Sequence, residues 1–150
     1  MYYAGIGSRQ TPPEILNTMT KIAQALGKLG YTLRSGGADG ADKAFEVGAV
    51  KKEIFRPRHA TPEAIELAMS LHPAPNKCND YVRKLHGRNA QIILGLNLDS
   101  PVEFVICWTK NGKIIGGTGL GIRLSMSKNI PIFNLANNKD FIKLQERLVK

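Results

Sequence analysis

Long hydrophobic runs are absent from this chain. Among its 150 residues, no stretch reaches the roughly 18 consecutive apolar residues that indicate a membrane-spanning helix. The opening residues 1–7 also lack the basic and apolar regions of a signal peptide. We therefore expect no membrane contact and a cytoplasmic location.

Cysteine is scarce as well. Cys78 and Cys107 are the two cysteines, with no Cys-x-x-Cys pair, and the three histidines, His59, His72 and His86, lie in unrelated sequence contexts. This pattern predicts reduced thiols rather than a disulfide, and no metal site. We also expect no cofactor, since no Gly-Lys-Ser/Thr P-loop and no strict Gly-x-Gly-x-x-Gly follows a predicted strand.

Acidic residues are few relative to basic ones. The chain has 12 acidic and 21 basic residues, a formal net charge of +9, and eight of the basic residues but only four acidic ones lie between Lys51 and Arg88. Such a balance favours an anionic partner, either a phosphorylated small molecule or a nucleic acid. With 43% hydrophobic residues, the chain is long enough for one domain with a sizeable core, and we expect residues 1–150 to form it.

Strand-like and helix-like segments alternate along the chain. Apolar strand patterns occur at 2–7, 31–34, 52–55, 102–108 and 130–134, and helical patterns occur at 12–29, 41–49, 62–71, 80–94, 122–128 and 138–149. The alternation predicts an α/β fold of the Rossmann-like, doubly wound type: a mainly parallel sheet of about five strands flanked by helices.

Three local features refine this prediction. Segment 102–108 is the most apolar strand and is expected at the centre of the sheet. Thr11 and Glu14 are spaced as a capping box for the first helix. The irregular segment 72–79 contains two prolines, which predicts a mobile flap over the site.

Two glycine-rich turns are the main candidates for a binding site. Each follows an apolar run and precedes a helical one, so its backbone N–H groups can hold one phosphate-bearing ligand. The candidate residues in the two turns are Ser35, Gly36, Gly37, Ala38, Asp39 and Asp42, and Gly116, Gly117, Thr118 and Gly119. Asp39 and Asp42 are either helix caps or acceptors for ribose hydroxyls. Thr118 and the helix that follows it make the second turn the better phosphate seat.

Taken in order, the motifs resemble one known family. They are residues 5–9 (Gly-Ile-Gly-Ser-Arg), 35–42 (Ser-Gly-Gly-Ala-Asp-Gly-Ala-Asp), 87–95 (Gly-Arg-Asn-Ala-Gln-Ile-Ile-Leu-Gly), 116–118 (Gly-Gly-Thr) and 130–134 (Ile-Pro-Ile-Phe-Asn). Together they are similar to the Rossmann-like domain of the DNA-processing protein A (Smf) family. The chain also resembles the wider superfamily of LOG phosphoribohydrolases and SLOG domains, whose small stand-alone members are frequent in phages; a phage-encoded chain would reside in the host cytoplasm. In residues 5–9, Gly7, Ser8 and Arg9 either supply N–H groups, a hydroxyl and a guanidinium to a ligand or form a structural turn. The resemblance adds Arg88 and Asn89 to the candidate ligand-binding residues.

The resemblance to the LOG enzymes has one departure. Their Pro-Gly-Gly-x-Gly-Thr-x-x-Glu motif supplies a catalytic glutamate, and alignment on residues 116–119 puts Arg123 at that position. The carboxylate of that mechanism is therefore missing, and no catalytic residue can be assigned.

Three functions follow from these observations. The first is binding of a nucleotide or nucleotide-derived phosphorylated ligand at the carboxyl ends of the strands. The alternatives are single-stranded DNA binding along the basic stretch 51–88, and N-glycosidic bond hydrolysis with a carboxylate from Asp39, Asp42, Glu46 or Glu103. The sequence leaves open whether the chain is an enzyme and whether it forms homo-oligomers.

Overall fold

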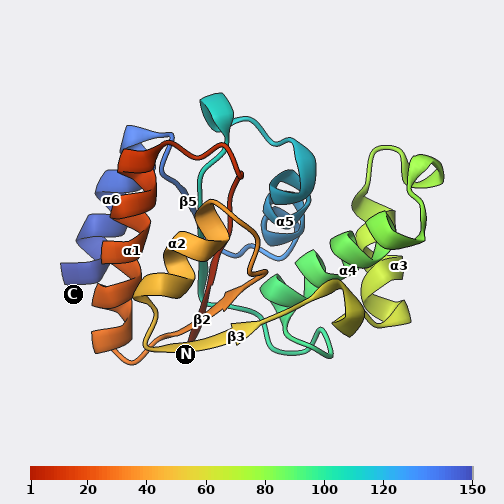
Figure 1. Cartoon of the computed structure of the whole chain (residues 1–150), viewed down its shortest axis with the longest axis horizontal. Coiled ribbons are helices and arrows are strands. Elements are labelled where there is room, and N and C mark those ends of the chain that lie inside the picture. The colour runs from red at the N-terminus through yellow and green to blue at the C-terminus, as the bar shows by residue number, and fades with distance from the viewer. Residues whose placement is uncertain (150) are drawn as a thin grey trace.

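The computed structural model describes residues 1–149 and contains one five-stranded parallel sheet (Figure 1). The strands are β1 (Tyr2–Gly5), β2 (Thr32–Ser35), β3 (Lys51–Ile54), β4 (Phe104–Cys107) and β5 (Ile132–Asn134). Their order across the sheet is β3-β2-β1-β4-β5, and every neighbouring pair is parallel. The predicted α/β, Rossmann-like fold is confirmed, because this order is that of a doubly wound sheet.

Six α-helices connect and cover the strands. They are α1 (Pro13–Lys28), α2 (Ala41–Gly48), α3 (Pro62–Leu71), α4 (Asp80–Leu94), α5 (Gly116–Ser127) and α6 (Asn138–Val149). In the described part of the chain, none of these helices has both the length and the apolar character needed to span a bilayer.

Side chains of alternate residues along the strands form two cores. Tyr3, Leu33 and Phe104 pack on one face of the sheet against α1, α2 and α6, whereas Ala4 and Val105 pack on the other against α4 and α5. All of these residues are buried. Parallel sheets in α/β folds are covered by helices on both faces, which explains why the interior strands are apolar on both sides.

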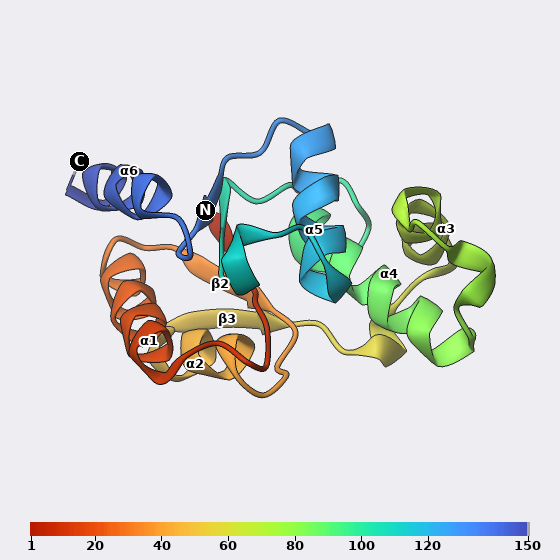
Figure 2. The ribbon, with the colours of Figure 1, turned by 90° about the horizontal axis from the view of Figure 1, so that it is seen from above.

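Helices α3 and α4 form a hairpin at the side of the molecule away from α1 and α6 (Figures 1 and 2). The segment 72–79 connects the two helices and contains a short 3-10 turn at Pro75–Lys77. Arg83 holds this segment, donating from Nε to the carbonyl of Cys78 (3.1 Å) and from Nη2 to that of Pro75 (2.9 Å). The prediction of a flap over the site is wrong, because no residue of this segment lines the pocket described below.

The two other local predictions have different outcomes. β4 is an interior strand between β1 and β5, as its apolar sequence predicts, with all four residues buried, and β1 beside it is the middle strand. The capping-box prediction for Thr11 and Glu14 is wrong. Helix α1 has Pro12 as its N-cap and no side-chain cap, because the Thr11 hydroxyl donates to the carbonyl of Ser8 (2.6 Å). Thr11 therefore stabilises the turn after β1 instead of the helix.

One edge of the sheet is formed by β3, which differs from the interior strands. Its residues Lys51, Lys52 and Glu53 are all exposed. Lys52 forms an ion pair with Glu46 (3.0 Å) on α2, and the buried guanidinium of Arg34 on β2 forms one with Glu53 (2.9 Å). Charged side chains thus cover the edge strand that carries the start of the basic stretch.

Candidate functional site

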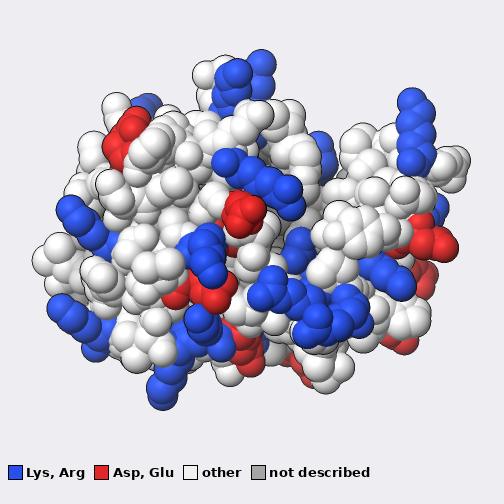
Figure 3. Space-filling view, viewed as in Figure 1, with Lys and Arg blue, Asp and Glu red and all other residues white. Residues whose placement is uncertain are grey.

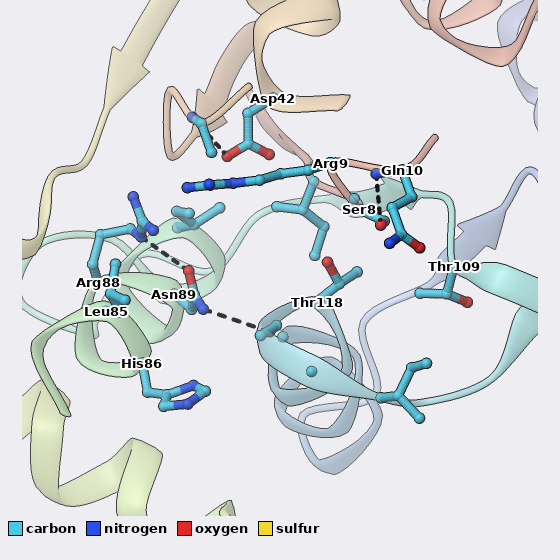
Figure 4. Close-up of a pocket in the computed structure, with 18 of the residues that line it drawn as sticks. Ser8, Arg9, Gln10, Asp42, Leu85, His86, Arg88, Asn89, Thr109 and Thr118 are labelled. Carbon is cyan, nitrogen blue, oxygen red and sulfur yellow. Dashed lines mark hydrogen bonds between the residues drawn. The ribbon is translucent and has the colours of Figure 1, made fainter. Parts of the chain in front are cut away.

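A pocket of about 500 Å³ lies at the carboxyl ends of β1, β2 and β4 (Figure 4). The loop after β1, the first turn of α2, one face of α4, the loop after β4 and the start of α5 line it. The strand order reverses between β1 and β4, and ligands bind at such switch points in open α/β sheets. The fold and the pocket together therefore define a Rossmann-like domain with a ligand-sized cavity at the usual place.

Arg88 is a buried cation in the wall of this pocket. Its side chain comes from α4, is 8% exposed, and donates from Nη1 to the carbonyls of Gly36 (2.9 Å) and Phe55 (3.1 Å). Its Nε donates to the side-chain oxygen of Asn89 (2.9 Å). Burial lowers the pKa of Arg88, and the nearby Asp42 carboxyl raises it in part; an arginine nevertheless stays charged at neutral pH. The guanidinium thus brings a fixed positive charge to the pocket and ties α4 to the first glycine turn.

Asp42 is a buried acid beside this cation. It lies in the first turn of α2 and accepts a hydrogen bond from the backbone N–H of Ala38 (3.3 Å). Burial raises the pKa of Asp42 from its ordinary value of 3.8 to about 6, and the Ala38 bond and the charge of Arg88 oppose the shift. Asp42 is the one acidic side chain that lines the pocket among the described residues.

Neither aspartate of the first turn is the N-cap of α2. The N-cap is Gly40, with a φ of +86°, and it makes no side-chain cap bond. Asp39 is exposed and does not line the pocket. A left-handed conformation suits glycine, so the chain turns into the helix at Gly40 without help from either carboxylate. The capping interpretation of Asp39 and Asp42 is therefore wrong.

Two further cations reach the pocket from loops. Arg9 follows β1 and Lys110 follows β4, and both are exposed. In Figure 4 the Arg9 side chain extends across the pocket toward Arg88, between Asp42 and Thr118. Lys and Arg side chains are also spread over the face of the molecule that Figure 3 shows, with fewer Asp and Glu side chains among them. The pocket and its surroundings are therefore electropositive.

The second glycine turn forms the opposite wall. Helix α5 begins at Gly116 itself, earlier than the predicted 122, and a loop rather than a strand precedes it. The Asn89 amide donates to the carbonyl of Gly117 (3.5 Å), which links α4 to this turn. Thr118 lines the pocket between them. The free N–H groups and partial positive charge of a helix N-terminus thus face the same cavity as Arg88.

The structure brings most of the predicted binding residues together. Those that line the pocket are Gly7, Ser8, Arg9, Ala38, Asp42, Arg88, Asn89, Gly116, Gly117 and Thr118. Those that do not are Ser35, Gly36, Gly37, Asp39 and Gly119. Three of these five have structural roles instead. The Ser35 hydroxyl donates to the Gly5 carbonyl (2.6 Å), and Gly36 and Gly37 leave room for the guanidinium groups of Arg88 and Arg56.

Sequence reasoning missed several pocket residues. They are Ile6, Gln10, Leu85, His86, Ile92, Thr109, Lys110, Ile115 and Gly121. The sequence could have indicated Thr109, because this residue directly follows an apolar strand, and ligand-binding loops of this fold begin at the ends of such strands. Its hydroxyl accepts a hydrogen bond from the Asn134 side chain (2.8 Å), which fixes the loop after β4 to the end of β5.

The other groups considered for catalysis lie outside the pocket. Arg123 donates from α5 to the carbonyl of Ile114 (3.3 Å) and holds the loop before the second turn. Glu46 pairs with Lys52. Glu103 is exposed and directly precedes β4, so it lies at the amino ends of the strands, whereas the pocket lies at their carboxyl ends. Within the described residues, Asp42 is thus the one carboxylate of the four candidates that lines the cavity.

Comparison with known proteins agrees with the fold. No family model matches the chain, and no curated protein matches it in sequence. Among solved structures it is similar to DNA processing protein A from Helicobacter pylori, whose study concerns its single-stranded DNA binding mode. The TM-score is 0.65 at 19% sequence identity, and the alignment covers 99% of this chain and 78% of that one. The chain therefore has the fold of DNA-processing protein A.

Proposed function

We propose that this chain binds single-stranded DNA and seats a backbone phosphate of the strand in the pocket. The observation that carries the proposal is the convergence of Arg9, Arg88, Lys110 and the N-terminus of α5 on one cavity that contains a single carboxylate among the described residues. Phosphate contacts supply most of the affinity of sequence-independent DNA binding. The similarity to a protein that binds single-stranded DNA supports the same partner.

Hydrogen-bond donors from three parts of the chain line the proposed phosphate seat. Arg88 uses Nε and Nη1 within the protein, so its Nη2 group has no hydrogen-bond partner in the described part of the chain. The start of α5 and the Thr118 hydroxyl lie across the pocket from it (Figure 4). An arginine N–H group, a hydroxyl and helix N-terminal N–H groups are all donors that suit a phosphate. Arg9 and Lys110, which are exposed, would contact the neighbouring phosphates.

A second candidate is a free nucleotide or nucleotide-derived ligand. The volume of about 500 Å³ lies within the usual range for a small-molecule site. Asp42 offers an acceptor for ribose hydroxyls on the side of the pocket opposite α5 (Figure 4). Both candidates use the same phosphate seat. They differ in whether a DNA strand or a single nucleotide is attached to the bound phosphate.

Binding measurements distinguish the two candidates. Fluorescence anisotropy of a labelled deoxythymidine oligonucleotide, repeated at several salt concentrations, gives the affinity and its salt slope. We expect Arg9→Ala and Lys110→Ala each to weaken binding and to reduce the salt slope by about one. Lys28→Ala is the matched control, because Lys28 is equally exposed but lies at the far end of α1.

Competition with unlabelled nucleoside monophosphates completes the test. If the oligonucleotide binds and the monophosphates do not compete, the DNA proposal stands. If monophosphates bind tightly and the oligonucleotide does not, the second candidate replaces it. Equal losses in Lys110→Ala and Lys28→Ala would show that DNA binds through overall charge and not at the pocket.

A further inference from the structure

The α3–α4 hairpin brings together three side chains that the sequence places apart. His72 directly follows α3, Cys78 lies in the connecting segment, and His86 lies on α4. One donor atom from each lies within 4.8 Å of the other two, and all three residues are half-buried. The prediction that these histidines have unrelated surroundings is therefore wrong for His72 and His86.

The local contacts orient the three groups toward one another. Nδ1 of His72 accepts a hydrogen bond from the backbone N–H of Ala74 (2.9 Å), and its Nε2 faces Sγ of Cys78 at 3.6 Å. The two imidazole rings are 4.8 Å apart at an interplanar angle of 68°. Nδ1 of His86 is buried and has no hydrogen-bond partner among the described residues. An unpaired buried nitrogen is costly, and a bound ion would satisfy it.

The spacing matches that of a metal centre. Zinc bonds of about 2.3 Å to sulfur and 2.0–2.1 Å to nitrogen at tetrahedral angles put the two donor atoms roughly 3.5 Å apart. Sγ of Cys78 and Nε2 of His72 are already 3.6 Å apart, whereas the donor atom of His86, which lies within 4.8 Å of both, would move closer when the ion binds. Burial, followed by the charges of His72 and Arg88, lowers the pKa of His86, which favours the neutral imidazole that binds metals.

We propose that His72, Cys78 and His86 form a binding site for a borderline transition-metal ion of the zinc type. A thiolate and two imidazoles select such ions, whereas magnesium and calcium require oxygen ligands. Three protein ligands leave a fourth tetrahedral position for water or another ligand. Because Arg83 already holds the backbone carbonyls of Pro75 and Cys78, the segment is partly positioned before the ion binds.

Binding must release protons. The Cys78 thiol loses its proton to become a thiolate ligand. Since Nδ1 of His72 accepts from Ala74, the neutral ring carries its proton on Nε2, and coordination there moves the proton to Nδ1 and breaks the Ala74 bond. Because protons leave when the ion binds, we expect the metal affinity to rise with pH and residues 72–79 to rearrange locally. The ion would join this segment to α4, where His86 also lines the pocket.

The test uses the full chain, reduced and without an affinity tag, titrated with Co²⁺ and then with Zn²⁺. We expect one equivalent of Co²⁺ with a sulfur-to-cobalt charge-transfer band that Zn²⁺ displaces. Cys78→Ser should abolish the band, and His72→Gln and His86→Gln should each weaken binding at least about tenfold. His59→Gln is the matched control, because His59 is exposed and outside the cluster.

Three outcomes would overturn the proposal: no stoichiometric binding at micromolar metal, a charge-transfer band that survives in Cys78→Ser, or an equal loss of affinity in His59→Gln. Circular dichroism checks that each variant is folded. Cys78→Ser changes one atom of a half-buried side chain, so it keeps the test decisive even if a histidine variant does not fold. Protection of Cys78 from alkylation by Zn²⁺ provides a second readout, because Cys107 is fully buried.

Discussion

The two glycine-rich turns have similar sequences but different surroundings. In the first turn a side chain added at Gly36 would meet the Arg88 guanidinium at 2.7 Å, and one at Gly37 would meet that of Arg56. In the second turn one at Gly116 would meet nothing within 4 Å, and one at Gly117 would meet only the Asn89 amide, at 3.1 Å. Glycine therefore makes room for the protein's own arginines in the first turn, whereas in the second it leaves the pocket open to a ligand.

Arg88 gives the largest expected effect, because it anchors the first turn and also faces the ligand. Arg88→Ala would leave the buried carbonyls of Gly36 and Phe55 without this donor. We expect the free energy of unfolding to fall by about 4 kcal/mol and oligonucleotide binding to be lost. Urea denaturation and anisotropy measure the two effects. A stable variant with normal binding would remove Arg88 from both roles.

Asp42 should make the stability of the first turn depend on pH. Its pKa in the folded protein, about 6, lies above the ordinary 3.8, so the folded state binds its proton more tightly than the unfolded state. The stabilisation that Asp42 contributes is fully present below about pH 4. As pH rises through about 6 it is lost, and the free energy of unfolding falls by up to about 3 kcal/mol. The urea midpoint of the Asp42→Asn variant should therefore fall less between about pH 4 and pH 6 than that of the unchanged protein. Parallel pH profiles would show that Asp42 is not the titrating group.

A direct comparison of the two turns uses valine at one glycine of each. Gly37 has a φ of +71°, which a β-branched residue strongly disfavours, and the new side chain would displace Arg56. We expect Gly37→Val to lower the free energy of unfolding by about 2 kcal/mol. Urea denaturation measures the loss, and Gly30→Val, with a φ of +90° but open space around it, separates backbone strain from the clash.

Gly117→Val should have the opposite profile. Its φ is not in the left-handed region, and the one nearby atom is at the end of the Asn89 side chain. We expect a change in stability below about 0.5 kcal/mol but at least about a tenfold loss of oligonucleotide affinity, because the side chain enters the phosphate seat. If Gly117→Val destabilises the protein as much as Gly37→Val does, the proposed difference between the turns is wrong.

The smallest expected effect concerns catalysis at the second turn. The resemblance to the LOG enzymes puts Arg123 at the place of their glutamate, and its side chain contacts the Ile114 carbonyl instead of the pocket. Because a positioned acid or base contributes about a hundred- to ten-thousand-fold in rate, we expect purified protein to release free base from nucleoside monophosphates slowly or not at all. Rapid release seen by chromatography would contradict this, and loss of that release in Asp42→Asn would identify the carboxylate.

The fold could be predicted from the sequence because it depends on periodic patterns. Buried strands such as β4 and amphipathic helices such as α1 are visible in the order of residues. The roles of single polar residues could not be predicted, because tertiary contacts decide them. Thr11 bonds to the turn after β1 instead of capping α1, and Ser35 bonds to Gly5 instead of facing a ligand. Likewise, the spacing of His72, Cys78 and His86 depends on how two helices pack.

The charged edge strand has a consequence for how copies of this chain can meet. An open parallel sheet offers unpaired backbone groups at each edge, and such edges invite pairing with other chains. On β3, three successive exposed residues are charged, and two of them are Lys51 and Lys52. A second β3 strand laid alongside would bring lysines together, which opposes sheet extension and aggregation. If copies of the chain associate, as the sequence leaves open, we expect them to do so through helical faces.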